Sequence, residues 1–230
     1  MGYLLAEGGA EFGGAMAKAD AEAIRLAGGQ DAPVVIVPTA AAPDRNHIRA
    51  GNQGRRWFQT LGAKNCSVAL IYDKESANDA AIAQVLESAT LIYLLGGFTH
   101  FLGTTLQNSA ALLAARRAYE NGAVIAGSSA GAMVMCQWYV DPETWQIYDG
   151  LNFIPNTIIA PHFNTFAKSW ISKIQHVKQD CAIWGIDERT GVIDDGTKRN
   201  WNVLGAGSAT IVRHSELQVF AANQTFQVEG

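Results

Sequence analysis

The chain has 230 residues, a formal net charge of −4 and 48% hydrophobic residues. A chain of this length can bury a sizeable core, and it suits one large α/β domain or two small ones. Its 17 basic residues are dispersed, which argues against a nucleic-acid-binding surface and against a polybasic membrane anchor.

The cysteines and the apolar runs indicate the compartment and the cofactor content. Cys66, Cys136 and Cys181 lie far apart in apolar surroundings, without a metal-binding spacing. We therefore expect reduced, buried thiols, none of them a metal ligand. The leading hypothesis set out below implies neither a metal nor an organic cofactor. The N-terminal segment does not resemble a signal peptide, and no apolar stretch approaches the length of a membrane span, so we expect a cytoplasmic protein.

Strands and helices are predicted to alternate over the first half of the chain. Strands are predicted at residues 2–6, 33–39, 67–72, 90–95 and 123–126. Helices are predicted at residues 15–26, 48–61, 77–88 and 99–120, most of them ending at a glycine. Continuous apolar runs are typical of parallel strands covered on both faces. The alternation predicts a doubly wound, mostly parallel α/β sheet with its ligand site beyond the carboxyl ends of the strands.

The last third of the chain has a different pattern. Short strands are predicted at residues 182–186, 190–193 and 217–221, and a hairpin at 203–204 and 208–213, turned at residues 205–207. No linker-like or low-complexity stretch separates this part from the rest. We therefore expect a C-terminal antiparallel extension of one core, and a single domain over residues 1–230.

Residues Gly127 to Gly131 form a G-x-S-x-G pattern around Ser129. A buried strand precedes the pattern and a helical run at residues 132–138 follows it, which is the context of a nucleophile elbow. The helix N-terminus offers free N–H groups to a developing oxyanion. A glycine- and serine-rich turn without chemistry is the alternative interpretation.

A serine nucleophile needs a base within hydrogen-bond reach, and the base needs a group that orients it. Among the histidines, His162 follows the apolar run 157–160 and Pro161, so it is expected at a strand end. His47 and His176 are expected to be solvated. His100 follows the glycine turn and is expected to start a helix, with a position near the site as the alternative. For the orienting acid, Glu188 follows the apolar run 183–186, with Asp187 facing the other way; Asp141 and Glu143 remain rival acids. The backbone N–H groups of Ala130 and Gly97 are the expected oxyanion donors.

At these positions the chain resembles the dipeptidase E and cyanophycinase family of serine peptidases. Four landmarks carry the resemblance: Leu95-Gly96-Gly97 with Thr99 and Leu102, residues Gly127 to Ala132, Tyr148 to Leu151 leading to Ala160-Pro161-His162-Phe163, and Gly185 to Glu188. The resemblance implies the flavodoxin-like sheet of class I glutamine amidotransferases, with Ser129, His162 and Glu188 as the catalytic residues. It also implies that the segment around Gly96, Phe98 and Thr99 contacts substrate.

The chain departs from that family at two places that concern the substrate. Phe98 stands where relatives usually carry Asn or Asp, and residues 163–180 contain no arginine, where relatives that cleave next to aspartyl residues carry several. The lysines at 168, 173 and 178 cannot reproduce a bidentate arginine grip. Arg45 and Arg49 are expected in a solvated loop, and the tryptophans at 138, 145 and 170 could wall a pocket for an apolar substrate. An aspartyl preference is therefore not expected.

The leading hypothesis is a serine peptidase that hydrolyses a peptide or isopeptide bond in short peptides through an acyl-enzyme. A short peptide is the expected partner, with no nucleic acid and no membrane, and the oligomeric state is left open, a homodimer included. One alternative is an α/β-hydrolase-type esterase that uses Ser129, Asp195 and His214 in that chain order. Another is a catalytically inactive homologue that binds a peptide or small molecule.

Overall fold

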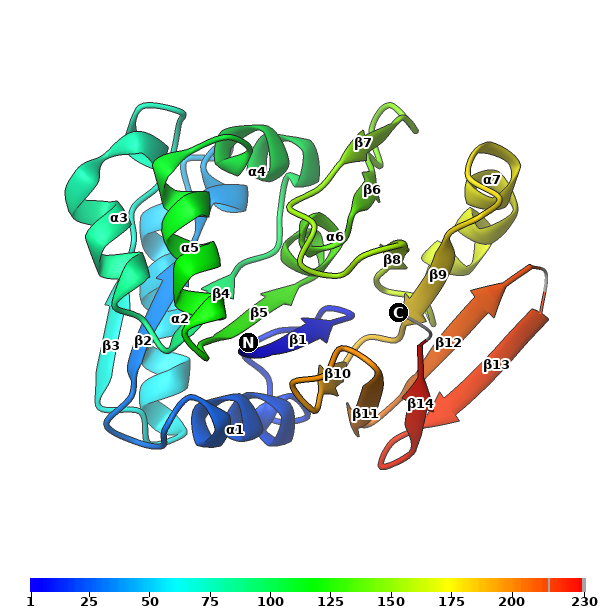
Figure 1. Ribbon diagram of the computed structural model, residues 1–230, viewed down its shortest axis with the longest axis horizontal. Helices are drawn as coiled ribbons and strands as arrows, with labels where there is room; N and C mark the ends of the chain where they lie inside the picture. The colour runs from blue at the N-terminus through cyan, green and yellow to red at the C-terminus, as the bar shows by residue number, and fades with distance from the viewer. Residues whose placement is uncertain (215, 229–230) are drawn as a thin grey trace.

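The computed structural model of the protein describes residues 1–214 and 216–228. Its larger sheet has eight strands in the order β14-β11-β10-β1-β5-β4-β2-β3 (Figure 1). The parallel strands are β1 (Tyr3–Glu7), β5 (Val124–Ser128), β4 (Leu91–Leu94), β2 (Pro33–Val37) and β3 (Asn65–Val68). The antiparallel strands are β10 (Thr190–Asp194), β11 (Asn200–Gly205) and β14 (Thr225–Gln227).

Helices cover both faces of this sheet. The helices are α1 (Ala17–Leu26), α2 (His47–Thr60), α3 (Ala80–Glu87), α4 (Thr99–Leu106), α5 (Ala110–Glu120) and α6 (Ala130–Met135), with short 3-10 turns at Thr39–Ala41 and Ser76–Asn78. Successive strand residues serve opposite faces: Leu4 packs in the core under α3 and α5, and Leu5 packs in the core under α1 and α2. Burial on both faces explains why these strands are continuous apolar runs. The predicted doubly wound, mostly parallel sheet is confirmed.

A second sheet of four strands, in the order β13-β12-β9-β8, lies beside the first (Figure 1). Strands β8 (Thr157–Ala160) and β9 (Ala182–Ile186) are parallel, whereas β12 (Ser208–Arg213) and β13 (Glu216–Ala221) are antiparallel. A short 3-10 turn (Ala167–Ser169) and helix α7 (Trp170–Val177) connect β8 to β9. The second sheet and the antiparallel strands of the first form the C-terminal extension; the expected single-domain organisation stays a prediction.

The predicted hairpin of residues 203–204 and 208–213 is wrong. Strand β11 pairs with β10 and β14, whereas β12 pairs with β9 and β13. Gly205 has a φ of 109°, and a Cβ there would lie 2.2 Å from the carbonyl oxygen of Arg189. The glycine turn therefore passes tightly over the start of β10 and leads the chain from one sheet to the other.

Three further differences come from local turns. The predicted helix at 99–120 is two helices, because Asn108 takes a φ of 54° and the Ser109 side chain caps α5 by accepting from the N–H of Leu112 at 3.1 Å. The predicted strand at 67–72 begins and ends earlier, as β3. A hairpin of β6 (Trp138–Val140) and β7 (Ile147–Asp149) was not predicted.

The two sheets meet where the site residues gather. The N–H of His162, after β8, donates to the carbonyl oxygen of Gly8 at 2.7 Å, and the N–H of Arg189, after β9, donates to that of Gly9 at 3.1 Å. The glycine loop after β1 thus ties the ends of β8 and β9 to the central strand of the main sheet. Among the described residues, no helix has the length and apolar character needed to cross a membrane; the cytoplasmic location stays a prediction.

Candidate active site

Ser129 lies between the end of β5 and the start of α6, with a φ of 50° and a ψ of −114°. Few non-glycine residues adopt such a backbone, and surrounding structure has to enforce it. A Cβ on Gly127 would lie 2.6 Å from the backbone carbon of Gly131, and a Cβ on Gly131 would lie 2.1 Å from the carbonyl oxygen of Leu94. Both glycines are therefore required by close backbone approach, and together they permit the sharp turn at Ser129.

His162 lies next to Ser129, with its Nε2 at 2.9 Å from Ser129 Oγ. Its ring packs against Gly9, where a Cβ would lie 2.2 Å from His162 Cε1. On another side, the half-exposed ring of Phe166 stacks on the imidazole, with 5.2 Å between centroids and 22° between planes. A glycine backbone and an aromatic ring thus fix the orientation of the imidazole.

Glu188 lies on the other side of the His162 ring from Ser129, with its Oε1 at 2.9 Å from His162 Nδ1. The N–H of Glu188 donates to Asn164 Oδ1 at 2.9 Å, which joins the loops that follow β8 and β9. The neighbouring Asp187 faces away and accepts from the backbone N–H and hydroxyl of Ser208 at 2.9 and 2.8 Å. The alternation expected for these two acids is present.

Neither rival acid, Asp141 or Glu143, bonds His162. Asp141 is buried and accepts from the N–H of Glu143 and the hydroxyl of Thr144 at 3.2 and 2.7 Å. Its carboxylate therefore closes the turn between β6 and β7, and the imidazole nitrogen of His162 that it would have to hold is bonded to Glu188.

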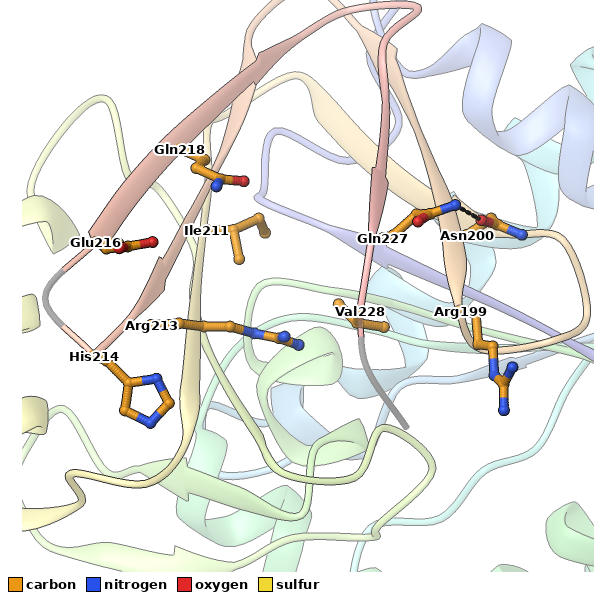
Figure 2. Close-up of a pocket in the computed structure, with 9 residues that line it drawn as sticks. All are labelled: Arg199, Asn200, Ile211, Arg213, His214, Glu216, Gln218, Gln227 and Val228. Carbon is orange, nitrogen blue, oxygen red and sulfur yellow. Dashed lines mark hydrogen bonds between the residues drawn. The ribbon is translucent and has the colours of Figure 1, made fainter.

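The alternative trio of Ser129, Asp195 and His214 is not brought together. The carboxylate of Asp195 accepts from Thr197 and Asn200 in the turn between β10 and β11. His214 lies at the end of β12 and lines a separate pocket with side chains of β12, β13 and β14 (Figure 2). Neither Ser129 nor Asp195 lines that pocket.

The glycines after β4 lie against the serine. A Cβ on Gly96 would lie 3.1 Å from Ser129 Cβ, and Gly97 has a φ of 138° with its Cβ position 2.4 Å from the carbonyl oxygen of Ala40. Within residues 1–214 and 216–228, the N–H groups of Gly97 and Ala130 donate to no protein acceptor. Two unengaged donors close to a serine hydroxyl are the requirement for binding an oxyanion.

The other residues expected near the substrate lie in different environments, some at cavities and some in the core. Phe98 lines cavities on both sides of the glycine segment. Thr99 is buried and its hydroxyl donates to Met133 Sδ at 3.7 Å, so that group points into the helix packing. Arg45 and Arg49 are exposed, as expected, but Arg49 lies in helix α2 and not in the predicted loop.

An aromatic row extends from His162 through Phe166. The ring of Trp170 is 5.8 Å from Phe166 and 5.4 Å from Trp145. Lys173 Nζ lies 3.7 Å above the Trp145 ring, and Lys178 Nζ lies 3.8 Å above the ring of Trp138. These two lysines are held on tryptophan faces, where cation–π attraction stabilises them.

A buried acidic pair under the elbow was missed by the sequence reasoning. The carbonyl oxygen of Glu7 accepts from the N–H of Ser129 at 3.0 Å. The Glu7 carboxyl accepts from the Tyr93 hydroxyl, and that of Asp20 accepts from Trp57 Nε1 at 2.7 Å. Glu7 Oε1 and Asp20 Oδ1 are buried and have no hydrogen-bond partner among the described residues. Burial raises the pKa of Asp20 to about 7 and the pKa of Glu7 well above its usual value.

Glu11 was also missed. Its Oε2 accepts from the hydroxyl of Ser128, the residue before the nucleophile, at 3.0 Å. The available signal was its position: Glu7 and Glu11 flank the glycine turn at the carboxyl end of a predicted strand, where functional side chains of parallel sheets gather.

Taken together, a serine at a strained strand–helix turn, an imidazole, a carboxylate and two free N–H groups are the parts that serine hydrolases use. The sequence model of peptidase family S51 matches residues 3–200. The chain belongs to this family, and the predicted resemblance to the dipeptidase E and cyanophycinase group is confirmed.

Relatives with curated names and solved structures agree with this assignment. The chain is 28% identical over 204 residues to the cyanophycinase of Trichormus variabilis, covering 83% of this chain and 66% of the relative. It is 29% identical over 199 residues to that of Geminocystis herdmanii, covering 81% and 71%. The crystal structure of a peptidase from an acI-B1 Actinobacterium superposes with a TM-score of 0.89 at 27% identity, over 99% of this chain and 97% of the other.

A proposed peptidase E from Listeria monocytogenes shares the fold, with a TM-score of 0.62 at 20% identity, over 96% of this chain and 98% of that one. The chain spans about two thirds of the length of the first cyanophycinases that it matches. The matched family and the sheet order give no support to the α/β-hydrolase alternative.

Proposed function

We propose that the protein is a serine peptidase that hydrolyses a peptide or isopeptide bond in short peptides through an acyl-enzyme. The observation that carries the proposal is the hydrogen-bonded row Ser129–His162–Glu188, with 2.9 Å at each junction. Family membership and the peptidase structures that resemble the chain support the same reaction class.

In the proposed reaction, Ser129 Oγ attacks the substrate carbonyl carbon while His162 Nε2 takes the hydroxyl proton. Glu188 holds the imidazole and stabilises the imidazolium that forms. The oxyanion accepts hydrogen bonds from the N–H groups of Gly97 and Ala130. His162 then gives its proton to the leaving amine as the carbon–nitrogen bond breaks. Water, deprotonated by His162, attacks the ester carbonyl and releases the acid product and Ser129.

For the substrate, we propose a short peptide without an aspartyl preference. The curated relatives are cyanophycinases, but residues 163–180 of this chain contain no arginine. The lysines at 173 and 178 lie on tryptophan rings, and a single ammonium offers no bidentate grip on a carboxylate.

The test is labelling with a fluorophosphonate probe, which reacts with activated serines. The chain supplies a matched control, because Ser128 and Ser129 are adjacent serines on the same turn. We expect the wild-type protein and Ser128→Ala to be labelled and Ser129→Ala to stay unlabelled while folded, with the modified peptide identified by mass spectrometry. Equal labelling of Ser129→Ala, or a folded wild-type protein that is never labelled, would overturn the mechanism and favour a homologue that binds without catalysis.

A further inference from the structure

A cavity of about 300 Å³ opens beside the glycine segment that flanks Ser129. Gly96, Gly97 and Phe98 form one side of the cavity, and Glu11 and Phe12, from the loop after β1, form another. The mechanism described above uses none of the side chains in this cavity. Its position next to the nucleophile makes it a place for part of the substrate.

Glu11 faces the nucleophile across a single glycine. Its Oε1 lies 3.1 Å from the position that a Cβ on Gly96 would take, and Ser129 Cβ lies 3.1 Å from the same point. The other oxygen, Oε2, is held by the hydroxyl of Ser128 at 3.0 Å. Among the residues that the structure describes, no group donates to Oε1. One oxygen therefore fixes the carboxylate, while the other is free to accept a hydrogen bond from a substrate.

The cavity has a negative charge. Asp44 is a second carboxylate in its lining, and the lining contains neither lysine nor arginine. Arg45 follows Asp44 directly but does not line the cavity. A group of positive charge with N–H donors is the natural complement of such a lining, because hydrogen bonds between ionised partners are about twice as strong as neutral ones.

We propose that Glu11 determines specificity by binding a protonated amine on the acyl side of the substrate, the side whose carbonyl Ser129 attacks. The inference rests on the proposed function of Ser129. Two sources supply this chemistry: the α-ammonium group of a substrate whose first residue is attacked, and the side-chain ammonium of a basic residue. An α-nitrogen lies two bonds from the attacked carbon, roughly 2.5 Å away, which suits the short span between Ser129 and Glu11.

The experiment compares matched activated esters at pH 6.5, where an α-amino group is protonated. The leucine ester and the N-acetyl-leucine ester differ in the α-ammonium group. The N-acetyl-lysine and N-acetyl-norleucine esters differ in the side-chain ammonium group. The ratio of kcat/KM within each pair is measured for the wild type and Glu11→Gln, which keeps an acceptor for Ser128. Asp31→Asn is the control, because Asp31 is an exposed carboxylate paired with Lys64.

We expect the wild type and Asp31→Asn to prefer the cationic member of one pair by about 10- to 100-fold, the range of a charged hydrogen bond. Glu11→Gln should bring that ratio close to one. The pair that responds identifies the α-ammonium or the side-chain ammonium as the ligand. A wild type without charge preference, or a Glu11→Gln variant with the wild-type ratio, overturns the proposal. An equal loss of kcat/KM on both esters of a pair would show that Glu11 supports the turn at Ser129 and does not bind the ammonium group.

A failure of the proposed function is recognised separately, because neutral esters and fluorophosphonate need Ser129 and not Glu11. In that case, peptide binding is measured by calorimetry with Ser129→Ala and with Ser129→Ala/Glu11→Gln. Leu-Leu and N-acetyl-Leu-Leu differ in the α-ammonium group, as do Lys-Leu and N-acetyl-Lys-Leu. N-acetyl-Lys-Leu and N-acetyl-norleucyl-Leu differ in the side-chain ammonium group. Tighter binding of the cationic member by about 10-fold or more, lost with Glu11→Gln, supports the proposal. Equal affinities in both proteins contradict it.

Discussion

The two sides of the candidate site are built in different ways. Ser129 is positioned by one contiguous strand–turn–helix of the main sheet, and the glycines at 127 and 131 permit its backbone conformation. His162 and Glu188 stand at the ends of β8 and β9 in the second sheet. They reach Ser129 because the loop after β1 accepts hydrogen bonds from the ends of both strands.

This difference separates local from long-range determinants. The turn at Ser129 is permitted by glycines two positions away on either side, so a short motif predicts it, although the N–H of Ser129 also donates to the distant Glu7 carbonyl. The base and the acid depend on contacts with residues about 150 to 180 positions away, and no short motif records those contacts. Changes on the two sides should therefore have different consequences, and three variants test the comparison.

The largest effect is expected from Glu188→Gln. The amide keeps the shape but removes the charge that orients the imidazole and stabilises the imidazolium, so we expect kcat/KM to fall by about 10³- to 10⁴-fold. The adjacent Asp187→Asn is the control, since Asp187 bonds Ser208; it should lower the unfolding midpoint and leave the rate within a few-fold of the wild type. Similar rate losses in both variants would show that the reaction needs the packing of this loop, and not the carboxylate of Glu188 in particular.

A smaller loss is expected from Gly9→Ala, which tests the long-range side directly. A Cβ at Gly9 would lie 2.2 Å from His162 Cε1, so the ring has to move away from Ser129, and we expect kcat/KM to fall by roughly 10²-fold, as for catalytic groups misplaced by about 1 Å. Gly28→Ala is the matched control: its φ of 109° is close to the 115° of Gly9, and no atom lies within 4 Å of the new Cβ. Both variants carry the same backbone strain, so equal activities, measured with a neutral ester, would contradict the proposed role of Gly9.

We expect Asp20→Asn to have the smallest effect on the rate and to act mainly on the stability of the folded state. Burial raises the folded-state pKa of Asp20 to about 7, whereas an unfolded aspartate has a pKa of about 3.9. The folded state therefore binds this proton more tightly. The stabilisation is complete below about pH 4 and is lost as the pH rises through 7.

The free energy of unfolding, measured with urea at pH 5 and pH 8, should fall more steeply in the wild type than in Asp20→Asn. Between pH 5 and pH 8, the free energy of unfolding of the wild type should fall by on the order of 2 kcal/mol more than that of Asp20→Asn. Asp31→Asn should follow the wild type, because Asp31 is exposed. Parallel curves for the wild type and Asp20→Asn would mean that protonation of Asp20 does not contribute to stability.

Much of the main sheet could be predicted because its strands are buried on both faces. The runs at 33–39 and 90–95 are apolar without interruption, and helices follow each of them. One error, besides those at local turns, arose where the partner of a strand is decided by tertiary contacts. The turn at 205–207 has the residues of a hairpin, but its two strands join different sheets, and pairing is not encoded in the turn itself.

The candidate site likewise contains some residues that the sequence predicts and others that it does not. Ser129, with its flanking glycines, follows from the local pattern, and His162 and Glu188 were predicted from strand ends and the family resemblance. Glu11, Asn164 and Phe166 were missed, because their partners Ser128, Glu188 and His162 lie 117, 24 and 4 residues away, and no spacing rule indicates these contacts. The Glu7–Asp20 pair was missed for a similar reason. The role of an acid at the end of an apolar strand can be inferred only once the residue that faces it is known.

The glycine loop after β1 has a consequence for synthesis of the chain. Gly8 and Gly9 leave the ribosome long before Arg189, which bonds Gly9, and before strand β10, which pairs with β1. A nascent chain that ends before Glu188 has the serine and the histidine but lacks the carboxylate. Under the proposed mechanism, a nascent chain therefore gains the capacity to cut peptides only after Glu188 has been added and has folded against His162.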